Sequence, residues 1–85
     1  MSVEDKRLSR LLEHEMYRYQ SLDVSDANVQ VTRSVGYIGG TIRPAAGLYY
    51  LNMKEEMRIL TEASRKIPGL RDLVIDAKIE TSPRR

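Results

Sequence analysis

The feature that most constrains this chain is the absence of cysteine from a sequence of only 85 residues. A domain this short buries about 60% of the surface that its unfolded chain exposes, so its core is small and its stability marginal. Without cysteine, neither disulfide bonds nor metal–thiolate sites can reinforce that core. The chain also has no Trp and no Phe, so we expect a core of packed Leu, Ile, Val and Met side chains.

The length leaves room for one domain, which we expect to span residues 1–80, with a frayed polar tail over residues 81–85. The first twenty residues are charged throughout and contain no apolar signal segment. No apolar run approaches the ~20 residues that are needed to span a bilayer. The sequence as written therefore predicts a cytoplasmic location.

Apolar residues at helical spacing predict a first helix near the N-terminus. Ser2 is the expected N-cap, and Glu4 and Asp5 suit the positive end of the helix dipole. The apolar stripe consists of Leu8, Leu11, Leu12, Met16 and Tyr19. The stripe fades at Leu22, and residues 23–28 read as a polar connector with turn chemistry.

Alternating β-branched residues predict a strand at residues 29–32 and another at 37–42, joined by a turn at 33–36. Such a short link allows only antiparallel pairing, so the two strands form a hairpin. Gly39 and Gly40 weaken the second strand and indicate a bulge or a close backbone approach there.

A second helix is expected from Asn52, whose capping pair is Glu55, to the Pro68–Gly69 stop. A third strand follows at residues 73–79, where apolar residues alternate with polar ones. The elements predict an α+β fold, with two helices packed on one face of a three-stranded mixed sheet in the order α-β-β-α-β. The expected buried residues are Leu8, Leu12, Val29, Val31, Ile38, Ile42, Leu60, Ile67, Leu70, Leu73 and Ile75.

Three stretches together resemble the BON domain over about residues 4–80. They are the apolar face of the first helix, the hairpin through residues 29–31 and 36–42, and the junction from Ala63 through Gly69 and Leu70 into the strand that ends at Ile79. Between Gly40 and the second helix, the chain is longer than the family pattern by roughly two helical turns.

The resemblance implies a small αββαβ binding module without a catalytic constellation. Such modules usually belong to envelope or transport proteins and are thought to bind phospholipid surfaces or other proteins. The resemblance therefore implies a protein partner or an anionic membrane surface as the ligand, and it makes envelope association an alternative to a free cytoplasmic protein.

The residues needed for catalysis or metal binding are scarce. His14 is the only histidine, so a transition-metal site and a nucleophile–histidine pair are both disfavoured. The neighbouring glutamates diverge around their helices and read as surface or capping charges rather than an acid–base pair. We expect a protein that is not an enzyme and has no metal and no cofactor.

Basic residues follow one flank of the first helix and form a candidate surface for an anionic partner. They are Arg7, Arg10, His14 and Arg18, at positions i, i+3, i+7 and i+11. A basic stripe beside an apolar face suits lipid headgroups, phosphate or an acidic protein. The alternative is an ordinary solvated flank, because nearby glutamates neutralise part of the charge.

The insertion before the second helix contains a candidate protein-contact segment, Leu48, Tyr49, Tyr50 and Leu51. Tyrosine-rich apolar segments are favoured at interfaces, and a homodimer is the simplest such contact. The alternative is that the segment extends the second helix and covers the sheet.

A small nucleic-acid-binding domain is the alternative function. The segment from Gly36 to Gly39 resembles the GxxG loop of KH domains, which clamps a nucleic-acid backbone, and helix arginines could assist. However, a working GxxG loop is exposed and lies between two helices, whereas this segment reads as a strand. The net charge of +2 is also low for this class, so nucleic acid is the less favoured partner.

Overall fold

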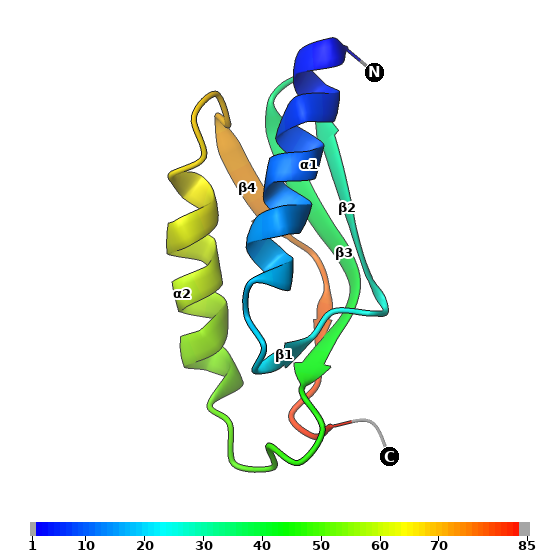
Figure 1. The fold of residues 1–85 in the computed structure, drawn as a ribbon, viewed down its shortest axis with the longest axis vertical. Helices are drawn as coiled ribbons and strands as arrows, with labels where there is room; N and C mark the ends of the chain where they lie inside the picture. Colours follow the sequence, from blue (N-terminus) through cyan, green and yellow to red (C-terminus); the bar gives the residue numbers. More distant parts are fainter. Residues whose placement is uncertain (1, 84–85) are drawn as a thin grey trace.

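The computed structural model describes residues 2–83, which form two helices and five strands. In chain order these are α1 (Val3–Tyr17), β1 (Leu22–Asp23), β2 (Ala27–Thr32), β3 (Val35–Pro44), α2 (Met53–Arg65), β4 (Asp72–Ile75) and β5 (Lys78–Ile79). β3 pairs with all the other strands, antiparallel with β1 and β2 and parallel with β4 and β5. α1 crosses in front of β2 and β3, and α2 lies beside α1, next to β4 (Figure 1).

The predicted α+β class is confirmed, but the prediction of three strands is wrong, because the described residues form five. β2, β3 and β4 correspond to the predicted strands, the hairpin is as expected, and the parallel β3–β4 pair makes the sheet mixed, as predicted. β1 was missed because Leu22 reads as the end of the first apolar stripe, whereas it lies opposite Pro44 in the sheet. β5 was merged with the third strand, which is interrupted after Ile75.

The N-terminal cap and the buried face of α1 follow from its sequence. The Ser2 hydroxyl accepts a hydrogen bond from the Asp5 N–H at 3.0 Å, which confirms the predicted N-cap. Leu8, Leu12 and Met16 are buried, but Leu11, also in the predicted stripe, is 38% exposed. Gly36 in β3 allows α1 to approach closely, since a Cβ there would lie 2.8 Å from Leu12 Cδ2.

The turn of the β2–β3 hairpin consists of two non-glycine residues in the left-handed region. Arg33 has φ 53° and Ser34 has φ 65°. The Asp5 carboxylate, from the first turn of α1, accepts hydrogen bonds from both of their N–H groups, at 3.1 and 3.0 Å. Asp5 is buried, and this contact fastens the start of α1 to the hairpin.

The C-terminal half follows the predicted order with an earlier helix end. Asn52 Oδ1 accepts a hydrogen bond from the Glu55 N–H at 3.2 Å, as the capping pattern predicts. α2 ends at Arg65, so the predicted Pro68–Gly69 stop is too late. Gly69, which is left-handed at φ 92°, lies in a following turn rather than at the helix end. Most predicted core residues are buried, and the remainder are only partly buried, namely Val29, Ile67, Leu70 and Ile75.

The single domain expected over residues 1–80 and the polar tail expected over residues 81–85 stay predictions, and residues 84–85 of that tail lie outside the described residues. Neither helix among residues 2–83 has the length and apolar character that a bilayer crossing requires.

Candidate binding surfaces

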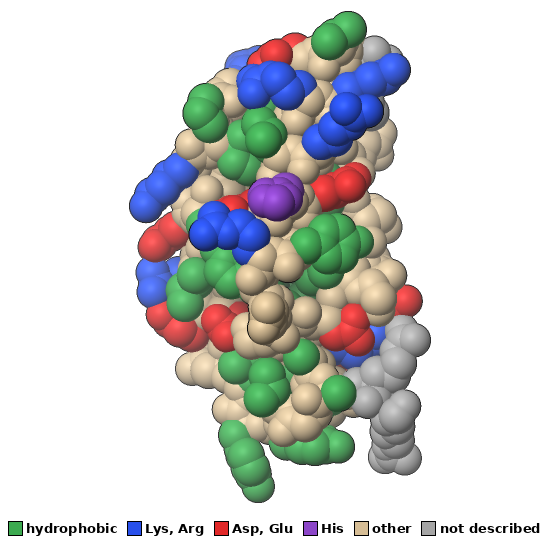
Figure 2. Space-filling view, viewed as in Figure 1, with side chains coloured by type: hydrophobic (Ala, Val, Ile, Leu, Met, Phe, Trp, Pro, Cys, Tyr) green, Lys and Arg blue, Asp and Glu red, His purple; other side chains and the backbone are tan. Residues whose placement is uncertain are grey.

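The outward face of α1 combines basic and apolar side chains around a shallow hollow. The hollow has a volume of about 530 Å³ and is lined by Val3, Lys6, Arg7, Arg10 and Leu11. Val3 is 85% exposed and therefore stands clear of the core. Figure 2 shows basic and apolar side chains interspersed on the upper part of this face, with the single histidine below them.

The four basic residues predicted to form one flank differ in their surroundings. Arg7 Nη2 lies 2.6 Å from Glu4 Oε1, and Arg18 Nη1 lies 3.0 Å from Glu15 Oε2. The hydrogen bond from Arg7 also lowers the pKa of Glu4 below its ordinary value, so Glu4 stays charged and offsets Arg7. These two arginines are therefore largely neutralised, as the alternative interpretation of the flank requires.

Arg10 and His14 are both exposed, and among residues 2–83 neither has an ion pair. Lys6, which was not among the predicted residues, is likewise exposed and unpaired within the described chain. Its position four residues before Arg10 was a signal for the same face, since residues i and i+4 are neighbours on a helix. Within the described residues, the positive charges of this face that remain available to a ligand are therefore mainly those of Lys6 and Arg10.

The Leu48–Leu51 segment is a loop and not an extension of α2, so that alternative is wrong. Leu48 is 40% exposed, Tyr49 is 65% exposed and Tyr50 is fully exposed, whereas Leu51 is partly buried against the core. Three large side chains therefore extend from a chain whose remaining apolar residues mostly pack inside. Such clusters are common at partner sites.

We expect this segment to mediate self-association. Replacing Leu48 and Tyr50 with Ser removes most of the exposed apolar area of this segment. The change should convert a dimer into a monomer and leave the circular dichroism signal of the helices unchanged. Sedimentation velocity measures the mass. The matched control replaces Leu11 and Tyr17, an exposed pair on α1, with Ser and should leave the mass unchanged. A wild-type monomer at high concentration would contradict the prediction.

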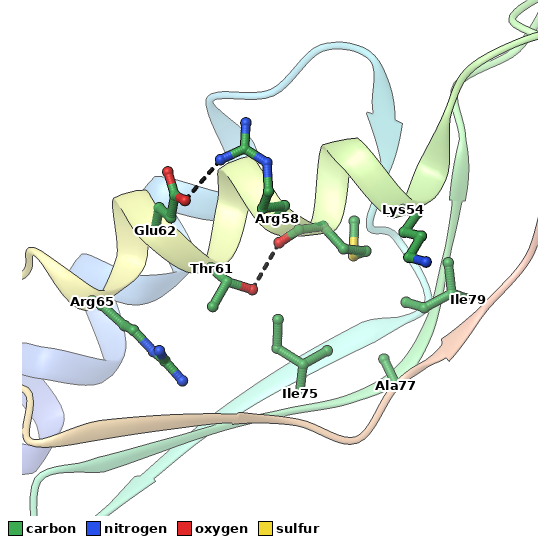
Figure 3. Close-up of a pocket in the computed structure, with 9 residues that line it drawn as sticks. Lys54, Arg58, Thr61, Glu62, Arg65, Ile75, Ala77 and Ile79 are labelled. Atoms are coloured by element: carbon green, nitrogen blue, oxygen red, sulfur yellow. Dashed lines mark hydrogen bonds and ion pairs between the residues drawn. The ribbon is translucent and has the colours of Figure 1, made fainter.

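A groove that was not predicted from the sequence runs between α2 and β4–β5. Its volume is about 460 Å³. Ile75, Ala77 and Ile79 form its floor and point towards α2, while Lys54 and Arg65 lie towards its two ends (Figure 3). Of these three residues, only Ile75 was predicted to be buried, and the groove itself depends on the separation of α2 from the sheet edge, which the sequence pattern does not encode.

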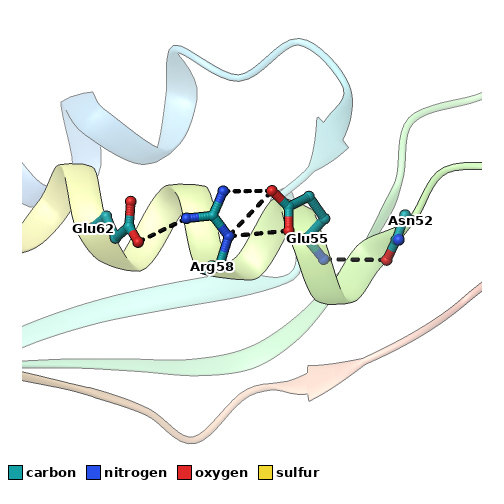
Figure 4. A network of polar contacts seen from close by, with 4 residues as sticks. All are labelled: Asn52, Glu55, Arg58 and Glu62. Carbon is teal, nitrogen blue, oxygen red and sulfur yellow. Dashed lines mark hydrogen bonds and ion pairs between the residues drawn. The ribbon is translucent and has the colours of Figure 1, made fainter.

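A polar network on α2 fixes the charges beside this groove. Arg58 Nε lies 3.0 and 3.1 Å from the two Glu55 carboxylate oxygens, and Arg58 Nη1 lies 2.7 Å from Glu62 Oε1 (Figure 4). The hydrogen bonds that Arg58 donates to Glu55 and then to Glu62 raise the pKa of Arg58, and the bond that Glu55 accepts from Arg58 lowers the pKa of Glu55. Arg58 thereby pairs with Glu62, the one acidic side chain among the groove's lining residues, while it is shared with Glu55.

Within residues 2–83, no group of three or more His, Asp or Glu side chains could hold a metal ion. The segment from Gly36 to Gly39 lies inside β3, where Gly36 is buried, so it does not form an exposed loop of the GxxG type.

No family model matches the chain, and a search of curated proteins finds no similar sequence.

Proposed function

We propose that this protein is a non-catalytic, BON-like interaction module that binds anionic phospholipid surfaces through the outward face of α1. The observation that carries the proposal is that Lys6 and Arg10, two cations without an ion pair among residues 2–83, lie with exposed Val3 and Leu11 around one hollow. The sequence resemblance to BON domains supports the same class of ligand. The order of the main elements, α1, β2, β3, α2 and β4, is the order that the resemblance implies.

Both kinds of side chain have a role at a lipid surface. A cation near an anionic leaflet contributes about 1 kcal/mol to binding. This attraction falls off with distance over about one Debye length, and the Debye length shortens as salt is added. Exposed apolar side chains can enter the boundary between headgroups and acyl chains. Tyr17, 65% exposed, adds an aromatic ring of the type that is favoured at such a boundary.

Arg7 and Arg18 are expected to contribute less than Lys6 and Arg10. Each already has a glutamate partner on α1, so a lipid phosphate would replace an existing ion pair instead of adding a new one. His14 lies four residues after Arg10 on the exposed face of α1 and would serve as a hydrogen-bond donor to a headgroup.

The nucleic-acid alternative loses the feature on which it was based, because the Gly36–Gly39 segment is part of β3. The helix cations remain compatible with any polyanion. The experiment therefore includes a nucleic-acid arm, in which we expect binding weaker than to anionic vesicles of equal phosphate concentration.

The test measures co-sedimentation with vesicles of phosphatidylcholine containing phosphatidylglycerol, at low salt. Replacing Lys6 and Arg10 with Gln should weaken binding roughly thirtyfold, since two cations at about 1 kcal/mol each are lost. The matched control replaces Lys54 and Arg65 with Gln, which removes the same two residue types from the other helix, and it should bind like wild type. Equal losses in the two variants would show a general charge effect and contradict the proposal. So would wild-type protein that does not bind anionic vesicles.

A further inference from the structure

We infer that the groove between α2 and β4–β5 binds an extended peptide of another protein, one with apolar residues at alternate positions and an acidic residue at each end. The peptide adds to the sheet as a strand beside β5. This surface is separate from the α1 face, so the inference does not depend on lipid binding.

The first argument is the open edge of the sheet. Within the described residues, β4 and β5 pair with β3 and with no further strand. The Glu80 N–H donates to the Ile42 carbonyl oxygen of β3 at 2.9 Å. Because successive N–H groups of an extended chain point to opposite edges, the N–H of Ile79 faces away from β3. An edge with unpaired main-chain groups is a template for another strand.

The second argument is the floor of the groove. Ile75, Ala77 and Ile79 project on the same side of the chain, towards α2 (Figure 3). Their two-residue spacing equals the period with which an extended peptide presents its own side chains. Met57 contributes a flexible thioether from the helix side, a side chain that adapts to varied apolar partners. Main-chain pairing at an edge, with pockets for alternate side chains, is an established mode of peptide recognition.

The third argument is charge complementarity. Among the lining residues, Glu62 is held by Arg58, which leaves Lys54 at one end and Arg65 at the other (Figure 3). Lys54 has no ion pair within residues 2–83, and Arg65 lies 3.9 Å from Asp72 with both side chains mostly exposed. An ion pair of this length between exposed side chains contributes little to stability, so a peptide carboxylate can replace Asp72 as the partner of Arg65. The Arg65 end also shares that residue with a smaller hollow of about 240 Å³, which is lined in addition by Leu70, Arg71 and Asp72.

The spacing of the two cations sets the length of the peptide. Lys54 and Arg65 are eleven positions apart on one helix, which corresponds to about 16 Å. An extended chain covers that distance in about five residues. A peptide of about seven residues, with Glu at positions 1 and 7 and apolar residues at positions 3 and 5, therefore directs the two Glu carboxylates and the two apolar side chains to the side of α2 and reaches both cations.

The experiment uses the whole protein and the acetylated, amidated peptide Glu-Thr-Val-Thr-Val-Thr-Glu, in which Glu and Val share one face, with binding followed by isothermal titration calorimetry. Replacing Lys54 and Arg65 with Gln should weaken binding roughly fivefold, as expected for the loss of two exposed ion pairs. The Lys6 and Arg10 double variant is the matched control and should bind like wild type. The same peptide with Lys in place of both Glu residues should bind more weakly than the acidic peptide.

Strand addition has its own test, which separates it from simple charge attraction. Two further peptides carry N-methyl groups, one on the Val residues and the other on the Thr residues. The N–H groups of the Val residues point to one edge of the peptide strand and those of the Thr residues to the other, so only one group of N–H donors faces β5. Methylation of the donors that face β5 should lower the affinity at least about tenfold, whereas methylation of the others should leave most of it.

The inference would be overturned if the acidic peptide did not bind at millimolar concentration, or if the lysine peptide bound as tightly as the acidic one. It would also be overturned if the two double variants of the protein lost the same affinity, or if the two N-methylated peptides lost the same affinity. A wild-type dimer that the Lys54 and Arg65 replacements convert into a monomer would show that a second copy occupies the groove, and would overturn it too.

Discussion

Replacing Gly40 with Ala is expected to lower the free energy of unfolding by about 3 kcal/mol, a large part of the stability of a domain this small. Gly40 has φ 84°, a conformation that costs any residue with a Cβ. A Cβ at this position would also lie only 2.2 Å from the carbonyl oxygen of Asp26. That oxygen accepts a hydrogen bond from the Thr41 N–H at 3.1 Å, so it cannot move away without breaking the pairing beside β3.

Gly47 provides a matched control for the backbone strain alone. It has the same φ of 84°, but a Cβ built there would meet no atom within 4 Å. Replacing Gly47 with Ala should therefore cost only about 1 kcal/mol. Urea denaturation measures both variants, and an unchanged slope would show that the native state alone is affected. Equal losses at the two positions would mean that the contact with Asp26 is unimportant.

The parts of the fold that could be predicted from sequence are those that local chemistry determines. Ser2 and Asn52 are each followed three residues later by an acidic residue, and each side chain caps its helix as predicted. The alternating residues of the hairpin determine which side chains face α1, because a strand places successive side chains on opposite faces. These signals act over three or four residues and need no knowledge of the rest of the chain.

The features that were missed depend on residues far apart in the sequence. β1 has only two residues, Leu22 and Asp23, so it carries no periodicity, and it exists because Arg43 and Pro44 are there to pair with it. The groove likewise needs α2 and β5 to stand at a particular separation, which neither segment encodes alone.

The candidate sites show the same division. The basic flank was visible as a helical pattern, yet its available charge depends on side-chain pairing. Arg7 and Glu4, three residues apart, form an ion pair, whereas Lys6 and Arg10 have no carboxylate partner among the described residues. The Leu48–Leu51 segment was visible from composition, but its exposure depends on where α2 begins.

Replacing Asp5 with Asn is expected to lower the urea midpoint at pH 7 clearly, although the change conserves shape. The Asp5 carboxylate accepts hydrogen bonds from the N–H groups of Ser34 and Arg33. The main-chain N–H of Asp5 donates a further hydrogen bond to the Ser2 hydroxyl. An amide offers one oxygen and directs an NH₂ group at the second donor. The left-handed turn would then lose one of its two anchors to α1, and a buried N–H would be left without an acceptor.

The pH dependence distinguishes this charge from a packing effect. Hydrogen bonds from the N–H groups of Ser34 and Arg33 lower the pKa of Asp5 in the folded protein. A carboxyl with a lowered folded pKa stabilises the native state above its unfolded pKa and loses that contribution as the pH falls through the folded value. The difference between wild type and the Asn variant should therefore be constant from pH 5 to 7 and shrink below about pH 4.

Glu4 provides the control, because it lies in the same turn of α1 and its pKa is also lowered, by the hydrogen bond from Arg7. Glu4 is exposed, so replacing it with Gln should shift the midpoint only slightly, as is usual for a surface ion pair. Urea titrations of the three proteins between pH 2.5 and 7 make the comparison. If the Asp5 and Glu4 variants lose the same stability at pH 7, the carboxylate does not anchor the hairpin. If the Asp5 deficit is as large at pH 2.5 as at pH 7, the anchor does not depend on its negative charge.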